Sequence, residues 1–226
     1  KNKQVFQMKT ISGDKTYQVW KDSLKFILEE GREFVDEDGR TCNEYMNLAM
    51  KIISPKGDIK APINKLNGFE RWIYPSLSEI ERNIISKEPS LGYEYSYGER
   101  IFSYSADGEE KDQINDFVIP LLKENKKSRR AVVEIWNPLK DSNIFKKEIP
   151  GLVMLDFKIS SGELNVTGII RSNDIFYGWP ASVYQCFKLQ EFVAKKLGVD
   201  IGFLSTISTS AHIFKEQKEY IQEILD

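Results

Sequence analysis

The sequence predicts an α/β protein, because stretches with helical periodicity alternate along the chain with short apolar stretches typical of strands. At 226 residues, with 41% hydrophobic and 12% aromatic side chains, the chain can bury a substantial core. We find no internal repeat, low-complexity tract or linker-like stretch. We therefore expect one domain over residues 1–226.

The first third of the chain predicts one helix and one strand. Apolar residues recur at intervals of three and four along the helix, at Tyr17, Trp20, Leu24, Ile27 and Leu28. Gly31 then ends it. Residues 36–39 predict an acidic turn, since a calcium loop would continue with more oxygen ligands and a distal glutamate. Alternating apolar residues over 46–52 predict a half-buried strand, and turn residues at 54–57 end it.

The middle of the chain predicts two helices, at residues 76–85 and 112–123, separated by the aromatic-rich stretch 93–104. Pro120 interrupts or kinks the second helix. Three short strands follow, at residues 131–136, 152–159 and 164–170. Residues 160–163 join the last two strands and carry a hairpin signal.

The strongest helical pattern comes after Pro180. One face of this helix is formed by Ser182, Cys186, Leu189, Val193 and Leu197. Gly198 closes the helix. A buried strand at residues 203–208 and a final amphipathic helix over residues 220–225 complete the predicted elements.

The charge balance limits the classes of ligand. The 32 basic and 34 acidic side chains give a net charge of -2, which argues against a general nucleic-acid binder but leaves room for a small anion held by a few arginines. Two cysteines are too few for a disulfide framework, and no apolar run approaches the ~20 residues that span a bilayer. With no hydrophobic leader in the sequence, we expect a soluble cytoplasmic protein.

Two clusters could hold an anion. Residues 126–130 end in Arg129 and Arg130, which form either a solvated cluster that complements a helix dipole or a phosphate site with two guanidinium groups. Arg171 and Ser172 offer a second pair at a strand end, a usual place for ligand sites in α/β proteins.

Several common chemistries have no support in the sequence. His212 is the only histidine, and with two scattered cysteines it cannot assemble an ordinary zinc site, so no metal is expected. A lone histidine near a strand end can be structural or functional. The glycine spacings of phosphate-binding loops and the Gly-x-Ser-x-Gly elbow are both missing from the sequence, which disfavours ordinary kinases and hydrolases.

Residues 171–180, Arg-Ser-Asn-Asp-Ile-Phe-Tyr-Gly-Trp-Pro, resemble the signature of the thymidylate synthase family, Arg-Ser-x-Asp followed by Gly-x-Pro. Further matches occur in the family's order and spacing: Tyr97-Gly98, Asp112-Gln113, Ser128-Arg129-Arg130, Trp136-Asn137-Pro138 and Ser210-Ala211-His212-Ile213-Phe214. The resemblance covers roughly residues 93–214, while the N-terminal third is only loosely similar. The short chain and the Ser-Ala-His run look most like the short archaeal branch.

The resemblance implies a three-layer α/β fold whose mixed sheet forms a back-to-back homodimer interface. It also implies a pyrimidine nucleoside monophosphate as ligand, either dUMP or dCMP. In the family, the pair matching Arg129 and Arg130 reaches the nucleotide phosphate from across the dimer interface, whereas the pair matching Arg171 and Ser172 holds it from its own subunit.

The resemblance also implies roles for three other side chains. The position of Asp174 contacts the pyrimidine ring region, the position of His212 lies at the sugar hydroxyl, and the position of Tyr97 belongs to the group that assists proton removal. The one-carbon donor of the family is a methylenetetrahydrofolate-type or pterin compound.

Three positions depart from the family's pattern. Gly151 stands where the nucleophilic cysteine follows a proline, and it has no side chain with which to attack C6 of the ring. Ser182 replaces the asparagine that reads the base and makes fewer hydrogen bonds, so uracil and cytosine are both open. Phe214 lacks the tyrosine hydroxyl near the sugar.

Another thiol could replace the missing nucleophile. Cys186 lies one helical turn after Ser182 on the same face, so it is either a relocated nucleophile activated by Arg171 or a small core residue. Cys42 lies near Arg32 and Arg40, and we expect it to be a structural cysteine at the surface.

Three hypotheses follow. The first is an enzyme that transfers a methyl or hydroxymethyl group to C5 of the pyrimidine, with Cys186, Tyr97 and Asp174 as catalytic residues. The second is a binding or regulatory protein that keeps the nucleotide pocket without the reaction. The third is hydrolysis in that pocket, with Asp156 and Asp174 as acid and base.

Overall fold

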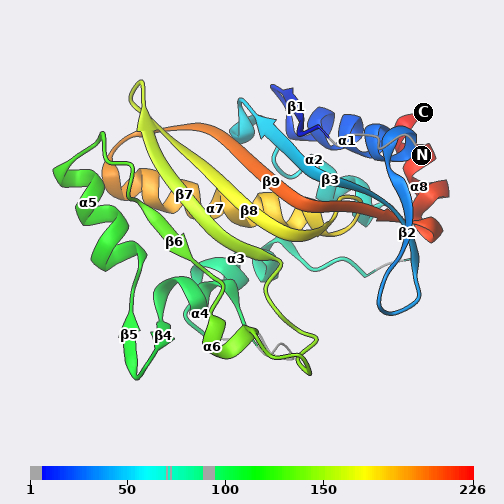
Figure 1. Ribbon diagram of the computed structural model, residues 1–226. Coiled ribbons are helices and arrows are strands. Elements are labelled where there is room, and N and C mark those ends of the chain that lie inside the picture. The colour runs from blue at the N-terminus through cyan, green and yellow to red at the C-terminus, as the bar shows by residue number, and fades with distance from the viewer. Residues whose placement is uncertain (1–6, 70, 72, 89–94) are drawn as a thin grey trace.

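The computed structural model describes residues 7–69, 71, 73–88 and 95–226. A seven-stranded mixed sheet forms its centre, in the order β1-β3-β9-β8-β7-β6, with β2 also paired to β3 (Figure 1). The strands are β1 (Lys9–Gly13), β2 (Arg32–Val35), β3 (Thr41–Ile52), β6 (Val132–Glu134), β7 (Leu152–Ser160), β8 (Glu163–Asp174) and β9 (Asp200–Phe214). The pairs β1–β3 and β8–β9 are parallel and the others are antiparallel. The predicted α/β class with a mixed sheet is confirmed.

Helices lie behind the sheet and along its edges (Figure 1). They are α1 (Thr16–Glu30), α2 (Ala61–Asn67), α3 (Leu77–Ile85), α4 (Tyr97–Phe102), α5 (Ile119–Glu124), α6 (Pro138–Asp141), α7 (Gly178–Leu197) and α8 (Lys218–Leu225). Short turns η1 (Pro55–Gly57), η2 (Ile114–Val118) and η3 (Lys215–Gln217) and the hairpin β4 (Tyr104–Ala106) to β5 (Glu109–Lys111) complete the elements. In the described part of the chain, the face of β7, β8 and β9 toward the viewer carries no helix.

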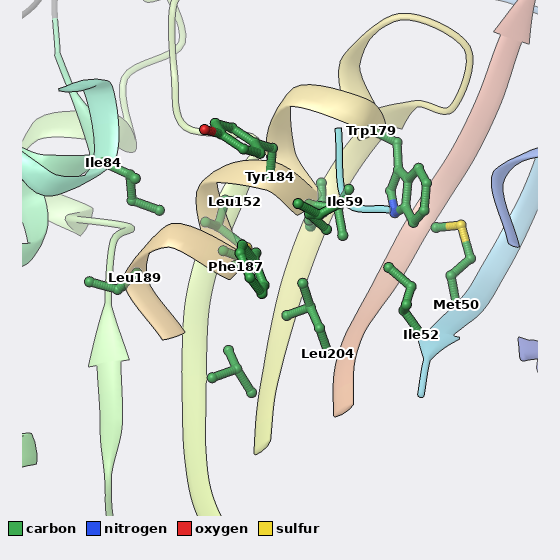
Figure 2. Close-up of a cluster of buried hydrophobic side chains, with 14 of the residues drawn as sticks. Met50, Ile52, Ile59, Ile84, Leu152, Trp179, Tyr184, Phe187, Leu189 and Leu204 are labelled. Atoms are coloured by element: carbon green, nitrogen blue, oxygen red, sulfur yellow. The ribbon is translucent and has the colours of Figure 1, made fainter. Parts of the chain in front are cut away.

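The core forms between α7 and the opposite face of the sheet. Figure 2 shows Trp179 and Phe187 of α7 facing the strands that carry Met50 and Leu204. Trp179 is fully buried, and its Nε1 donates to Thr206 Oγ1 at 2.9 Å, so its polar atom is satisfied inside the core. Each large apolar side chain buried in this way contributes about 1.5–3 kcal/mol, which makes the crossover helix a main source of stability.

Three strands are several residues longer than the sequence pattern predicts, and one of them is β8, which continues to Asp174 and not only to residue 170. β3 begins at Thr41 and not at residue 46, and β9 spans Asp200–Phe214 and not residues 203–208. Polar side chains such as Glu44, Ser210 and His212 occupy the added parts because these parts line a pocket. The alternation of apolar and polar residues therefore stops there, although the strand pairing continues.

The segment around Pro120 changes helix type. A π-helical turn, η2, runs directly into α5, and Pro120 lies in the first turn of α5, where a missing N–H costs little. The helix α4 was not predicted within the aromatic-rich stretch. Ser96 begins it, because its side chain accepts a hydrogen bond from Glu99 N at 3.0 Å. Tyr93 lies outside the described residues.

The predicted hairpin between β7 and β8 is confirmed. Ser161 and Gly162 have φ values of 54° and 84°, the left-handed pair that a two-residue turn of this kind requires. The predicted stop of α7 is confirmed in the same way, since Gly198 has φ 65°. Within the described residues, none of the helices is long and apolar enough to cross a membrane.

Candidate functional site

A pocket of about 210 Å³ lies where β8 and β9 end beside the β2–β3 hairpin. Its lining is Phe34, Asp36, Glu37, Asp38, Arg40, Cys42, Glu44, Arg171, Ser172, Ser210, His212 and Phe214. Strand pairing places Glu44 of the lining directly opposite His212. On its other side His212 pairs with Asp174, which lies next to the pocket but is not part of its lining. Sequence segments more than 160 residues apart therefore meet at this point.

Arg171 joins the pocket to the start of β7. Its Nε donates to Pro150 O at 2.9 Å, and its Nη2 donates to Ile149 O at 3.2 Å. Its backbone N–H donates to Gly151 O at 2.8 Å. Among the residues that the structure describes, two of the five guanidinium N–H groups are used in this way, and the other three are available to a ligand in the pocket.

Arg40 is a pocket residue that the sequence did not single out. Asp36 fixes it by accepting hydrogen bonds from Arg40 N at 2.8 Å and from Arg40 Nε at 3.0 Å. The guanidinium carbon lies 4.1 Å from the centre of the Phe214 ring, a cation–π arrangement. The sequence feature that could have indicated Arg40 is its place directly after Gly39. Gly39 has φ 79°, which allows the chain to reverse there and brings Arg40 back toward the sheet.

The pocket mixes both signs of charge. Arg40 and Arg171 supply the positive charge, while four carboxylates supply the negative charge: Asp36, Glu37, Asp38 and Glu44. The hydrogen bond from Arg40 N, the largest cause, holds the pKa of Asp36 below its ordinary value, so this carboxylate is ionised at neutral pH. Such a site suits an anion of low charge and opposes a highly charged one.

His212 and Asp174 have different roles in this arrangement. Burial lowers the pKa of His212, although Asp174 acts in the opposite direction, so the imidazole is neutral near pH 7 and offers one donor and one acceptor. Asp174 accepts from the backbone N–H groups of Phe176 and Tyr177, both at 3.0 Å, and from Gln217 Nε2 at 2.8 Å. Burial raises the pKa of Asp174. These bonds close the β8–α7 turn, which is a positioning role.

Tyr97 lies against Gly151 at the start of β7. Its hydroxyl oxygen accepts a hydrogen bond from Leu152 N at 3.4 Å, and burial raises its pKa, so the hydroxyl keeps its proton. A Cβ atom added to Gly151 would lie 3.4 Å from Ser172 O and 3.8 Å from Tyr97 Oη. The backbone at Gly151 therefore has room for a side chain, and that side chain would lie near Ser172.

Arg129 and Arg130 lie far from this pocket within the same chain. Both are exposed and precede β6, and the adjacent Ala131 accepts a hydrogen bond from Phe157 N at 2.9 Å. Phe157 is six residues along β7 from Gly151, a span of roughly 20 Å at ~3.3 Å per residue. The structure does not bring this pair together with Arg171 in one subunit.

The structure decides between the alternatives for Cys186 and corrects the expectation for Cys42. Cys186 is fully buried, and burial raises the pKa of its thiol to about 12, which favours the packing interpretation over the catalytic one. The expectation that Cys42 lies at the surface is wrong, because it is 3% exposed and lies in β3. Cys42 nevertheless lines the pocket, and its thiol donates to Phe34 O at 3.5 Å. Burial also raises the pKa of Cys42.

Two further candidates lie outside the pocket lining. Ser182 is half-buried in the first turns of α7, and its hydroxyl donates to Gly178 O at 3.2 Å. Asp156 lies in β7, next to the edge strand β6, where it pairs with Val132 and Thr167, and burial raises its pKa. Asp156 and Asp174 therefore do not face one pocket, which gives no support to a hydrolytic pair.

These features define the class of the protein: a mixed-sheet α/β protein with a polar, arginine-containing pocket at the ends of its strands. The chain belongs to the thymidylate synthase family, since the family model described as thymidylate synthase matches residues 64–226.

Curated relatives from methanogenic archaea support the same assignment, each under the description "Putative thymidylate synthase". The protein of Methanosarcina mazei is 34% identical, over 91% of this chain and 89% of its own length. The protein of Methanosarcina barkeri is 33% identical, over 98% and 94% respectively. The protein of Methanothermobacter marburgensis is 31% identical, over 94% and 97%. Family membership supports a transferase in nucleotide biosynthesis that acts by pyrimidine methyl transfer.

Proposed function

We propose that this protein binds a pyrimidine nucleoside monophosphate, with dUMP and dCMP as first candidates, and transfers a methyl or hydroxymethyl group to C5 of the ring. The observation that carries the proposal is the pocket that gathers Arg40, Arg171, Ser172 and His212. Two guanidinium groups and a hydroxyl suit the oxygens of one phosphate. The neutral imidazole of His212 suits a sugar hydroxyl.

The phosphate site would be completed by a second copy of the chain. Arg129 and Arg130 are exposed and roughly 20 Å along β7 from Gly151, so only a partner subunit could place them at the same phosphate. The helix-free face of the sheet offers the interface. Thr206 bonds to α7, so its neighbour Ile207 points to the opposite face, where it pairs with Ile169. We therefore propose a homodimer through this face (Figure 1).

The remaining proposed contacts concern the base. Asp174 would hold the turn that begins α7, and Ser182 in the first turns of that helix would approach the ring. Tyr97, protonated beside Gly151, would pass a proton to or from the substrate through an ordered water or directly. We also propose that residues 1–226 form one thymidylate-synthase-like domain that works in the cytoplasm.

The proposed transfer needs a side chain that attacks C6 of the pyrimidine ring. By the resemblance, Gly151 stands in the place of the attacking cysteine. Burial raises the pKa of both thiols, to about 12 for Cys186, but only Cys42 is part of the pocket lining. We therefore propose Cys42, and not Cys186, as the first candidate for a non-standard nucleophile that attacks C6.

A one-carbon donor of the methylenetetrahydrofolate or pterin type would supply the transferred group. The segment before β7 fits a flat apolar ligand, because Ile144 and Phe145 are 90% and 87% exposed. Lys147, two residues on, forms an ion pair of 3.0 Å with Asp38 at the pocket. Ile144 and Phe145 would thus hold the donor beside the nucleotide.

A second candidate function is nucleotide binding without the transfer reaction, as a sensor or regulatory partner. Gly151 and the buried Cys186 are the observations that favour it. Both candidates need the same pocket, so nucleotide binding alone does not separate them.

Tritium release to water separates the two candidates. The protein is incubated with C5-tritiated dUMP or dCMP, with and without methylenetetrahydrofolate, while nucleotide affinity is measured by calorimetry. Release above the rate without protein supports the transferase, and its loss in Cys42→Ser but not in Cys186→Ser identifies the thiol. Binding without release favours the regulatory role. A protein that binds no pyrimidine nucleotide contradicts both.

A further inference from the structure

Glu44 is a charged pocket residue to which the proposed function gives no role. It lies in β3, half-buried, directly opposite His212 of β9. Ser210 donates its hydroxyl to Glu44 Oε1 at 2.5 Å, which fixes the carboxylate at the lining of the pocket. A carboxylate fixed in this way beside an imidazole can accept hydrogen bonds from ligand hydroxyl groups in a defined direction.

The hydrogen-bonding capacity of Glu44 exceeds what the protein supplies. An ionised carboxylate has about four lone-pair sites, and Ser210 fills one of them. Among the described residues, Oε2 of Glu44 accepts no hydrogen bond. Oε2 is not one of the buried polar atoms that lack a partner, so it is accessible from the pocket, where a ligand hydroxyl can donate to it in place of water.

The position of Glu44 relative to the arginines indicates which part of a ligand it meets. Arg40 stacks on Phe214, and Arg171 lies at the end of β8, so a phosphate held between them would leave the adjoining sugar near His212 and Glu44. The volume of about 210 Å³ accommodates a sugar phosphate but is smaller than the 300–1,000 Å³ of a typical whole-ligand site.

We infer that Glu44, fixed by Ser210 and adjoining His212, selects a ribose, so that the protein binds a pyrimidine ribonucleoside monophosphate more tightly than its 2′-deoxy counterpart. A ribose offers two neighbouring hydroxyl donors, and carboxylates recognise the 2′-hydroxyl of ribose in other α/β sites. A deoxyribose offers one donor and leaves the carboxylate less satisfied. Phe214 has no hydroxyl group, so it cannot form the sugar contact that the family's tyrosine makes, and Glu44 and His212 are the polar groups left at the sugar. This inference rests on the proposed function of the pocket.

The test compares dissociation constants for UMP against dUMP and for CMP against dCMP by calorimetry on the full chain. We expect the wild type to bind the ribonucleotide about ten- to a hundredfold more tightly, the scale of one hydrogen bond to a charged group. Glu44→Gln should reduce the ratio to about threefold or less. Glu33→Gln is the matched control, because Glu33 is an exposed residue of the adjoining strand β2 and is not in the pocket lining, and it should leave the ratio unchanged.

Each outcome decides the inference. Equal or tighter binding of dUMP and dCMP by the wild type overturns it and leaves the proposed function intact. A ratio that Glu44→Gln does not change also overturns it. If Glu44→Gln does not fold, Ser210→Ala serves instead, and the ratio should fall because the carboxylate is no longer fixed. Absence of binding for all four nucleotides contradicts the proposed function itself.

Discussion

Arg171 and Gly151 are joined through the backbone, since Arg171 N donates to Gly151 O at 2.8 Å while the Arg171 side chain bonds to the carbonyl of Pro150. One residue thus fixes the start of β7 and presents its remaining N–H groups to the pocket. Arg171→Ala should weaken nucleotide binding by at least ~2 kcal/mol, because a charge-assisted contact and the order of residues 149–151 are lost together.

Arg171→Lys should recover little of this loss, since one ammonium group cannot reach both carbonyls and a phosphate at once. Calorimetry with UMP and dUMP measures both variants. A lysine variant with wild-type affinity would show that only the charge of Arg171 matters.

Gly151→Cys tests whether the missing thiol is what limits the reaction. A Cβ at this position would meet Ser172 O at 3.4 Å, an acceptable contact, so the stability loss should stay within about 1 kcal/mol. We expect tritium release from C5-labelled pyrimidine nucleotide to rise, because a thiolate beside the guanidinium of Arg171 can attack C6.

Gly151→Ser is the matched control for this gain, since it adds a side chain of similar size without a thiol. An increase in both variants would assign the effect to packing, and no increase in the cysteine variant would mean that more than the nucleophile has been lost.

Cys186→Ser should lower stability without lowering nucleotide affinity. The thiol is fully buried, and a hydroxyl in the same place costs about 1–3 kcal/mol unless it finds a partner. Because burial raises the pKa of Cys186 to about 12, iodoacetamide should not alkylate it in the folded protein at pH 8. Mass spectrometry of the alkylated protein and urea unfolding provide the measurements. Rapid labelling of Cys186 at pH 8 would contradict its placement.

His212 should make the folding stability depend on pH. Burial keeps the pKa of folded His212 below its ordinary value of 6.5, against the opposing effects of Asp174 and Glu44. The unfolded chain therefore binds a proton near pH 6.5 that the folded chain resists, so stability falls as the pH drops below about 7.

Urea unfolding of the wild type and of His212→Asn between pH 7.5 and 5.5 checks this sign. Arg40 and Asp36 also act on His212, but both remain in the variant, so the difference between the two proteins isolates the imidazole. A wild type that gains stability on acidification relative to the variant would mean that His212 is charged in the folded state.

The fold was largely predictable because its elements follow local rules. The periodicity of α1 and α7, the Ser161-Gly162 turn and the stop at Gly198 are each determined by neighbouring residues. The pocket was only half predictable. Arg171, Ser172 and His212 follow from the family's motifs, whereas Arg40 and Glu44 reach the site through the pairing of β3 with β9, which joins residues over 160 positions apart. No local pattern contains that pairing.

Mixed dimers test whether the phosphate site is shared between subunits. Arg129→Ala alone should weaken nucleotide binding by more than ~1 kcal/mol, while Lys126→Ala, in the same exposed segment, should not.

In the proposed homodimer each site takes Arg171 from one subunit and Arg129 from the other. A mixed dimer of Arg129→Ala and Arg171→Ala chains then has one site with both defects and one intact site. Equal amounts of the two variants that exchange freely form mixed dimers as half of all dimers, so calorimetry should detect near-wild-type affinity at about a quarter of all sites. Full affinity in Arg129→Ala, or no recovery in a mixed dimer confirmed by native mass spectrometry, would contradict the shared site and leave the exposed arginines as a solvated cluster at the end of α5.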